Sequence, residues 1–318
     1  MTDKWDAIII GGGAAGLSAA LMLSRARRSV LVIDAGKPRN GVAPHMHGVL
    51  GHDGTSAVDL LARGRRDIEG YGGVVLSGDV TDLSPESSGG FRVTSTAGIH
   101  RAPHVMVATG LADELPAISG LAELWGTGVV VCPYCDGWEK RDQRIGVIAT
   151  TPAQHQVQLL RQWSSDVTYF SRGIPLDDVA LRALDARGIT RVDADIERVH
   201  SQDSGAITID LVDGGSVEVD IVFTAPAGAP RDGFLRALGA AVSAQAPFGG
   251  AEFVAVDDMG RTSVPGLWAA GNSVNPAANV PLSMGTGSKV GAAINAELVE
   301  RDVAAALASA EGVPDLPQ

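Results

Sequence analysis

The chain has 318 residues, of which 45% are hydrophobic, 19% charged and 4% aromatic, and its formal net charge is −12. This composition is typical of a folded globular protein long enough for two domains, and the acidic balance argues against a surface that binds nucleic-acid phosphates. No apolar run approaches the ~20 residues of a membrane helix, and the first residues lack the apolar core of a secretion signal. We therefore expect a cytoplasmic protein with no nucleic-acid or membrane partner.

The N-terminal segment reads as a strand–helix–strand pattern around a glycine-rich turn. The predicted elements are a strand over 7–10, a helix over 17–27 and a strand over 30–33. Gly11, Gly13 and Gly16 form G-x-G-x-x-G, in which the glycines make the turn, admit a pyrophosphate and let helix pack on strand. Asp34 closes the second strand, where a carboxylate accepts hydrogen bonds from a ribose 2′-hydroxyl. The pattern predicts a dinucleotide site; the alternative is a turn that binds nothing.

Both cysteines of the chain lie in VVVCPYCDGWE, residues 129–139. A metal site is not expected, because zinc needs three or four protein ligands and no histidine spacing completes a set with Cys132 and Cys135. Two inert core cysteines are the other alternative, but in a cytoplasmic protein a C-x-x-C pair is more often catalytic. CPYC also resembles the glutaredoxin active site, although a glutaredoxin is a small separate domain.

A second strand–helix–strand pattern follows the cysteines. Its predicted elements are a strand over 145–149, a helix over 153–163 and a strand over 167–170. Its turn reads ATTPAQ, so Thr150, Thr151 and Pro152 stand where a pyrophosphate needs bare backbone, and Pro152 has no N–H to donate. After the second strand only Arg172 is near enough to meet a 2′-phosphate. We expect a dinucleotide-type domain whose nucleotide site is degraded.

Two further segments each read as a strand that ends in a turn. HVMVATG (104–110) ends in Ala-Thr-Gly, and TSVPGLWAAGNSV (262–274) ends in Ala-Gly-Asn. Together with the glycine turn, they resemble the two-dinucleotide-binding flavoprotein disulfide reductases. The resemblance implies FAD, with an acidic residue of the late strand reaching its ribityl chain. Asn272 stands at that position here and can still hydrogen-bond a ribityl hydroxyl, and the segment 278–299 reads as a helix aimed at the flavin.

The position of the cysteine pair between the two patterns resembles low-molecular-weight thioredoxin reductases. That resemblance implies that Cys135 faces the flavin, that Cys132 exchanges disulfides with the substrate, and that Asp136 transfers protons. The plain alternative for Asp136 is a residue of an Asp-Gly turn.

The longer motifs CPYCDGWE, DAGKPRN and MHGVLGHDG resemble thioredoxin-reductase-like dithiol oxidases, which make the disulfides of gliotoxin, holomycin and romidepsin. Such enzymes oxidise a small-molecule dithiol and pass the electrons through FAD to O₂, giving H₂O₂ without NADPH. Many members carry His after the second cysteine, whereas this chain has Asp136, so an NADPH-dependent thioredoxin-disulfide reductase stays as the alternative. A non-catalytic flavin redox sensor is a second alternative, and His47 and His155 are alternative bases.

The sequence therefore predicts an α/β protein with two Rossmann-like domains, the second inserted into the first. The FAD domain is expected over 1–114 and 248–318, and the inserted domain, carrying the cysteines, over 115–247. Relatives are homodimers, so a homodimer is expected. The catalytic set is Cys132, Cys135 and Asp136, with no metal ligand. The residues expected to contact FAD are Gly11, Gly13, Ala14, Ala15, Gly16, Asp34, Ala35, Gly36, Lys37, Arg39, Asn40, His47, Val80, Ala108, Thr109, Gly110, Gly271, Asn272, Asn279 and Val280.

Overall fold

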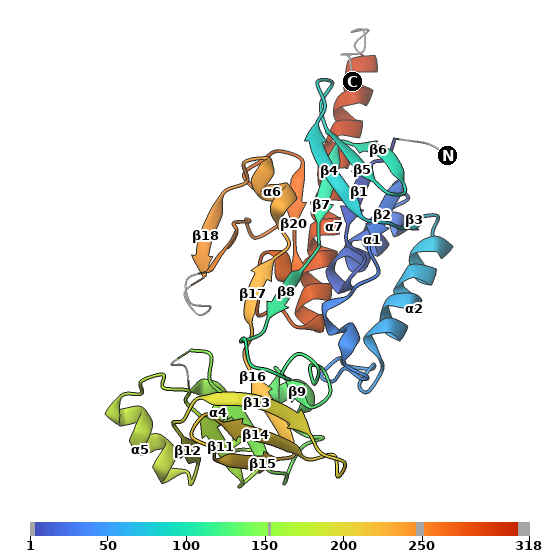
Figure 1. The fold of residues 1–318 in the computed structure, drawn as a ribbon. Helices are drawn as coiled ribbons and strands as arrows, with labels where there is room; N and C mark the ends of the chain where they lie inside the picture. The colour runs from blue at the N-terminus through green and yellow to red at the C-terminus, as the bar shows by residue number, and fades with distance from the viewer. Residues whose placement is uncertain (1–3, 152–153, 246–250, 311–318) are drawn as a thin grey trace. The chain divides into compact units, whose positions relative to one another are not determined.

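The computed structural model describes residues 4–151, 154–245 and 251–310, and the chain divides into two compact units (Figure 1). Unit 1 consists of Met1–Arg39, Ala57–Ala112 and Gly228–Gln318, and unit 2 consists of Asn40–Ser56 and Asp113–Ala227. Each unit has a five-stranded sheet, a three-stranded antiparallel sheet and helices. The predicted α/β class with two Rossmann-like units is confirmed.

The large sheet of unit 1 is parallel and has the strand order β20-β7-β1-β2-β3. Its strands are β1 (Ala7–Ile10), β2 (Val30–Asp34), β3 (Val74–Ser77), β7 (His104–Val107) and β20 (Leu267–Ala269). The strands β1 and β7 are buried along their whole length. Continuous apolar runs of this kind form the centre of a parallel sheet that is covered on both faces.

Helices cover one face of this sheet, and a small sheet and two short segments cover the other. The helices are α1 (Ala14–Arg25), α2 (Ala57–Gly70) and α7 (Val280–Ala310). The elements on the other face are β4 (Val80–Pro85), β5 (Phe91–Ser95), β6 (Gly98–Ala102), α6 (Gly233–Ala237), β18 (Val242–Gln245) and β19 (Ala251–Val254). Alternate residues of β1 serve the two cores: Ile9 packs on the helix side, and Ile8 and Ile10 pack on the other.

Unit 2 repeats this plan with a parallel sheet of order β12-β11-β10-β16-β9. Its strands are β9 (Val129–Val130), β10 (Ile145–Ile148), β11 (Val167–Phe170), β12 (Thr190–Val192) and β16 (Ile221–Thr224). The antiparallel sheet is β13 (Ile196–Ser201), β14 (Ile207–Leu211) and β15 (Ser216–Val219), and the helices are α3 (Pro133–Asp136), α4 (His155–Leu160) and α5 (Asp178–Ala186). Because β10 pairs with β11 and β16 as β1 pairs with β2 and β7, the two units share one topology.

The bounds of the units differ from the expected domain bounds in two long segments and at residues 113–114, which belong to unit 2. Residues 40–56, with the 3-10 turn η1 (Arg39–Val42) at their start, belong to unit 2, and residues 228–247 belong to unit 1. The second difference arises because α6 buries Leu235 against the unit 1 core and β18 pairs with β19. The chain passes between the units on β8 (Leu111–Glu114) and β17 (Ala227–Pro230), which pair with each other.

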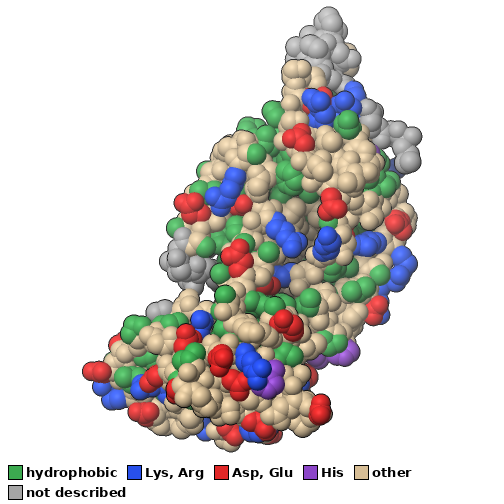
Figure 2. Space-filling model, viewed as in Figure 1, with side chains coloured by type: hydrophobic (Ala, Val, Ile, Leu, Met, Phe, Trp, Pro, Cys, Tyr) green, Lys and Arg blue, Asp and Glu red, His purple; other side chains and the backbone are tan. Residues whose placement is uncertain are grey.

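The surface carries both signs of charge. On the face drawn in Figure 2, acidic and basic side chains are interspersed over each unit instead of forming one patch of a single sign. Among the helices that the structure describes, none is both long and apolar enough to cross a membrane.

Candidate active site

Loops that follow the parallel strands of unit 1 bring most of the predicted cofactor residues to one edge of the sheet. The register places Ile10 opposite Ile33 on one side and opposite Val107 on the other, and Val107 opposite Ala269. The carboxyl ends of these strands therefore lie level, and ligands of parallel α/β sheets bind at such an edge. The loops that begin there carry Gly11–Gly16, Asp34–Gly36, Ala108–Gly110 and Gly271–Asn272.

The glycine turn forms a cradle that fits a dinucleotide. Gly11 has a φ of +105°, and a β-carbon on it would lie 2.5 Å from the Ala108 carbonyl oxygen. A β-carbon on Gly16 would lie 1.9 Å from the Gly11 oxygen, so both positions require glycine. Gly13 instead faces open space and stands as the N-cap of α1 without a side chain. The first N–H groups of α1 are thus accessible for a pyrophosphate.

Asp34 lies at the end of β2, beside the glycine turn. Its Oδ1 accepts a hydrogen bond of 3.0 Å from the Gly12 N–H, and its Oδ2 forms an ion pair with Arg65 of α2. These contacts fix the carboxylate at the turn. Its use as a ribose acceptor stays a prediction.

Asn272, in the 3-10 turn η3 (Gly271–Ser273), organises the loop before α7. Its side-chain Nδ2 lies 3.0 Å from the Asn275 oxygen, 3.3 Å from the Pro276 oxygen and 2.9 Å from the Ala278 oxygen. An aspartate could not donate to these carbonyl groups, which gives a structural reason for the amide at this position. Its Oδ1 is 3.5 Å from Nη1 of Arg39. The expected ribityl contact stays a prediction.

The other predicted cofactor residues are distributed over both units. Thr109 donates its hydroxyl to the Arg231 oxygen, and Asn279 caps α7 by accepting from the Leu282 N–H. Those that lie in unit 1 without a contact discussed above are Ala14, Ala15, Ala35, Gly36, Lys37, Val80, Gly110, Gly271 and Val280. Asn40 and His47 belong to unit 2.

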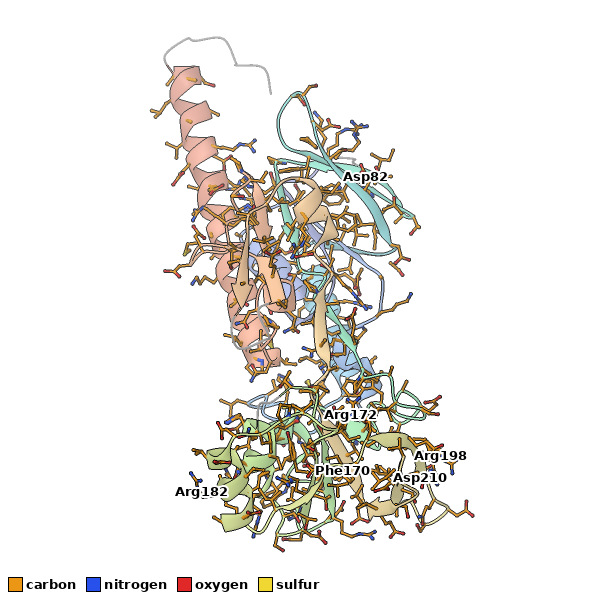
Figure 3. The ribbon with its side chains drawn as sticks, turned by 60° about the vertical axis from the view of Figure 1, so that its left-hand side comes forward. Asp82, Phe170, Arg172, Arg182, Arg198 and Asp210 are labelled. Carbon is orange, nitrogen blue, oxygen red and sulfur yellow. A yellow bond between two sulfur atoms is a disulfide. The ribbon has the colours of Figure 1, made fainter. Side chains whose placement is uncertain are left out.

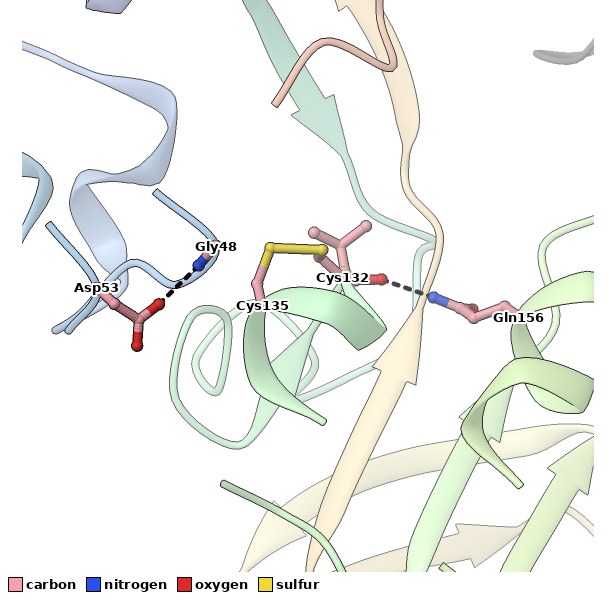
Figure 4. Close-up of a disulfide and its surroundings, with 6 residues drawn as sticks. Gly48, Asp53, Cys132, Cys135 and Gln156 are labelled. Carbon is pink, nitrogen blue, oxygen red and sulfur yellow. Dashed lines mark hydrogen bonds between the residues drawn. A yellow bond between two sulfur atoms is a disulfide. The ribbon is translucent and has the colours of Figure 1, made fainter. Parts of the chain in front are cut away.

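The cysteines form a disulfide at the start of α3, in unit 2. Cys132 is the N-cap of this short helix and Pro133 follows it, which favours a helical turn. The Cα atoms of Cys132 and Cys135 are 5.2 Å apart, within the usual range for a disulfide. Gln156 of α4 donates from Nε2 to the Val131 oxygen at 2.7 Å and thereby holds the strand end before the disulfide (Figure 4).

The other side of the turn packs against an indole. A β-carbon on Gly137 would lie 2.8 Å from the Trp163 ring and 2.4 Å from the Pro133 oxygen. The ring of Tyr134 meets Trp163 edge-on with centroids 5.9 Å apart, while Tyr134 itself is 72% exposed. Trp163 therefore holds the disulfide turn through its contact with Gly137, and the turn carries an exposed aromatic side chain, Tyr134, between its cysteines.

Asp136 is a half-buried carboxyl group directly after Cys135. Burial raises its pKa to about 6, and the negative charge of Glu139 adds to the increase, whereas His47 and Lys140 lower the pKa. A carboxyl group with a pKa near neutrality both accepts and releases protons at physiological pH. Asp136 is thus suited to the proton transfer that the resemblance implies, and this role stays a prediction.

His47 links the segment 40–56 to the cysteine turn. Its Nδ1 lies 3.2 Å from Oδ2 of Asp53, and its Nε2 lies 3.5 Å from Oε1 of Glu139. The other oxygen of Asp53 accepts the Gly48 N–H at 2.8 Å, in the surroundings of the disulfide (Figure 4). Sequence reasoning missed Asp53 and Glu139. For Glu139 a signal was present, because it follows Asp136 by three residues on a helical turn.

The turn after β10 stands where a glycine fingerprint would be in unit 2. The side chain of Thr150 fills the space at this turn. The Thr150 hydroxyl donates to the Ala225 oxygen at 2.7 Å, across the sheet edge where a pyrophosphate would lie. Thr151 is exposed, and Pro152 lies outside the described residues.

Arg172, labelled in Figure 3, follows β11 at the place where a 2′-phosphate would be bound. Its Nε is 3.3 Å from Oδ1 of Asp195, and its Nη1 is 3.4 Å from the Ala149 oxygen. The Ser171 hydroxyl donates to Asp193 at 2.7 Å. The Asp195 carboxylate therefore pairs with the one basic residue predicted to serve a 2′-phosphate, and its charge opposes phosphate binding there.

Comparison with known proteins agrees with this arrangement. The model of the family "Pyridine nucleotide-disulphide oxidoreductase" matches residues 5–296. Thioredoxin reductase tcpT of Claviceps purpurea is 32% identical over 308 residues, 92% of this chain and 94% of that protein. A probable thioredoxin reductase of Arthroderma benhamiae is 38% identical over 180 residues, which cover 54% of this chain but only 44% of that longer protein. The crystal structure of HlmI superposes with a TM-score of 0.90 at 41% identity, covering 98% of both chains.

The fold and the disulfide thus define a flavoprotein oxidoreductase of the thioredoxin-reductase-like class. The chain belongs to the pyridine nucleotide-disulphide oxidoreductase family, and its cofactor is FAD. The predicted cofactor and the predicted resemblance are confirmed. The residues that would hold FAD are those at the carboxyl edge of unit 1, whose glycine cradle fits the group. Among the described residues, no cluster of three or more His, Cys, Asp or Glu side chains is placed to hold a metal ion.

Proposed function

We propose that this oxidoreductase converts a small-molecule dithiol into a disulfide at Cys132–Cys135 and delivers the electrons to O₂. The observation that carries the proposal is the contrast within unit 2. The disulfide turn is well formed and half-buried, whereas Thr150 and Arg172, at the positions expected for the pyrophosphate and the 2′-phosphate of NADPH, make contacts within the protein. Reducing power then has to enter at the cysteines.

The chemistry at the cysteines follows from their order along the turn. A substrate thiol gives its proton to the Asp136 carboxylate and attacks Sγ of Cys132, and Cys135 leaves as a thiolate. The second substrate thiol then attacks the substrate sulfur of the mixed disulfide and closes the product ring, while its proton passes to the departing Cys132 sulfur. Because both substrate thiols belong to one molecule, this second attack occurs at high effective concentration.

The Cys132–Cys135 disulfide forms again when the pair gives up its two electrons, and FAD, held at the carboxyl edge of unit 1, would supply the electron acceptor that links the cysteines to O₂. The overall reaction balances as one dithiol and one O₂ giving one disulfide and one H₂O₂. Monothiols are expected to be poorer substrates, since they cannot close the ring.

An oxygen electrode tests the proposal. The FAD-loaded protein is mixed with a panel of small dithiols, such as reduced holomycin, in the absence of NADPH, beside the Cys132→Ser variant. Oxygen uptake with H₂O₂ release above the variant's background supports the oxidase. If no dithiol exceeds that background while NADPH with thioredoxin turns over, the oxidase proposal is wrong.

An NADPH-dependent thioredoxin-disulfide reductase is the second candidate. Asp136 favours it, because an acid after the second cysteine is the pattern of thioredoxin reductases, and the relatives above carry that name. A protein whose flavin is reduced neither by dithiols nor by NADPH would instead fit a redox sensor.

A further inference from the structure

The segment 40–56 lies nearly a hundred residues before the cysteine turn in the sequence, and its charged side chains contact that turn. His47 lies between two carboxylates, one from its own loop and one from the turn. Its side chain is 23% exposed, and that of Glu139 is 41% exposed. Acids therefore lie beside both ring nitrogens of the imidazole and hold the ring in place.

We propose that His47 is a positioning residue whose charge, set against that of Glu139, decides whether the Asp136 carboxyl group holds or releases its proton. The inference rests on the proposed function, in which Asp136 takes the substrate proton. The proposal gives neither His47 nor Glu139 a direct role at the cysteines. They act only through the carboxyl group.

The charges that act on Asp136 come from two elements. Glu139 and Lys140 lie on its own turn, and His47 lies on the loop, where Asp53 holds it. The imidazolium opposes the negative charge of Glu139, and Lys140 adds a second positive charge. When His47 is removed, Glu139 acts on Asp136 without this opposition, so Asp136 holds its proton more tightly.

The proton inventory of the exchange step depends on this balance. One proton leaves the attacking substrate thiol, one disulfide bond breaks, and one mixed disulfide and one Cys135 thiolate form. Asp136 accepts the proton only while it is a carboxylate, which is the state that the charge of His47 favours. With Asp136 protonated, the substrate thiol has no acceptor and the exchange slows.

The experiment measures the titration of Asp136 in the full-length, FAD-loaded protein. Aspartate labelled with ¹³C at Cγ reports each carboxyl group by NMR, and the Asp136→Asn variant assigns the resonance. The wild-type midpoint is expected near the pKa of about 6. His47→Gln keeps a hydrogen-bonding side chain without the charge and should raise the midpoint by roughly half a pH unit. Glu139→Gln should lower it by a similar amount.

The opposite signs separate a charge effect from a structural one, because both variants break the same contact. Equal directions, or an unchanged midpoint in His47→Gln, would overturn the proposal. His200→Gln is the matched control, since His200 also pairs with an aspartate in unit 2, Asp210, and should leave the midpoint in place. Far-ultraviolet circular dichroism shows that each variant is folded.

A kinetic readout keeps this inference apart from the proposed function. Mass spectrometry of labelled thiols measures the rate at which dithiothreitol reduces the disulfide. As the pH is lowered, this rate should begin to decrease at a higher pH in His47→Gln than in the wild type. If dithiothreitol does not reduce the wild-type disulfide at all, the proposed function fails, while the NMR titration still decides the role of His47.

Discussion

Gly287 of α7 faces the backbone of Ala15 in α1 so closely that a β-carbon on Gly287 would lie 2.0 Å from the Ala15 oxygen. One helical turn later, a β-carbon on Gly291 would lie 2.6 Å from the Ala19 oxygen. The two helices therefore touch through their main chains. Since α1 begins at the glycine turn, this contact fixes the start of the helix at the cofactor edge.

Gly287→Ala should destabilise the protein by about 2 kcal/mol, because the new methyl group forces the two helices apart. Gly285 lies in the same helix, is exposed and has open space around its Cα. Gly285→Ala should instead be neutral or stabilising by up to about 1 kcal/mol, through the higher helix propensity of alanine. Urea unfolding of both variants with FAD bound measures the difference, and equal stability of the two would contradict the close packing.

Asn272→Asp should weaken FAD retention, although the resemblance to flavoprotein disulfide reductases implies an acidic residue at this position. The carboxylate would face the oxygens of Asn275, Pro276 and Ala278 without a proton to donate. Leaving such groups unpaired costs about 1–3 kcal/mol, which corresponds to roughly 5- to 100-fold in affinity if the loop is ordered only when FAD is bound. Equilibrium dialysis of FAD checks this, with Asn275→Asp as the control of equal charge. Unchanged retention would show that the loop does not depend on the amide.

Asp136→Asn should stabilise the protein at pH 8 and leave its stability unchanged at pH 4. The folded protein holds the Asp136 proton more tightly than the unfolded chain, with a pKa of about 6 against 3.8. Asp136 therefore lowers stability as pH rises through that interval, and the whole cost is present above it. With solvent screening of a half-buried group, we expect about 1–2 kcal/mol. Urea unfolding at both pH values measures the free energy of unfolding. A variant that is stabilised only at pH 4 would contradict a raised pKa of Asp136 in the folded protein.

Cys135→Ser should trap the substrate on Cys132 as a mixed disulfide, because the free Cys132 thiol can still exchange with an oxidised substrate while no second cysteine displaces it. Cys132→Ser should accumulate much less adduct. Intact-protein mass spectrometry after incubation with an oxidised small dithiol measures the added mass. Adduct on Cys135 alone would mean that the roles of the two cysteines are exchanged.

NADPH should reduce the flavin far more slowly than a small dithiol does. Pro152 has no N–H to donate, and one hydrogen bond lost to a charged pyrophosphate costs about 1.5–3 kcal/mol, which is roughly 10- to 100-fold in affinity. Anaerobic stopped-flow mixing at micromolar NADPH follows the loss of flavin absorbance. Fast bleaching there would favour the reductase.

The fold of unit 1 was largely predictable because its strands are short apolar runs between glycine turns. The strand over 7–10 agrees with β1, whereas α1 begins at Ala14 instead of Leu17 and ends at Arg25. The start differs because Gly13 is the N-cap, and the end because Arg27 adopts a φ of +62°. The last helix runs to Ala310 instead of 299, since alanine-rich sequence continues the helix beyond its buried face.

The second unit was less predictable. The helix expected over 153–163 is shorter and spans His155–Leu160, and Ala153 lies outside the described residues. The cysteine turn and its acid were found from local spacing. The contacts of His47 with Asp53 and Glu139 could not be found in this way. They depend on the segment 40–56, which belongs to unit 2 although the rest of that unit begins only at Asp113.

The disulfide of this chain encloses only two residues, Pro133 and Tyr134. Closing so short a ring restricts the unfolded chain by about 2 kcal/mol, much less than a bond across a long loop. The turn is also held by ties that contain no sulfur, namely the Gln156 hydrogen bond and the contact of Gly137 with Trp163. If the bond opens in each turnover, as proposed above, every opening removes this constraint of about 2 kcal/mol, while the two ties without sulfur still hold the turn.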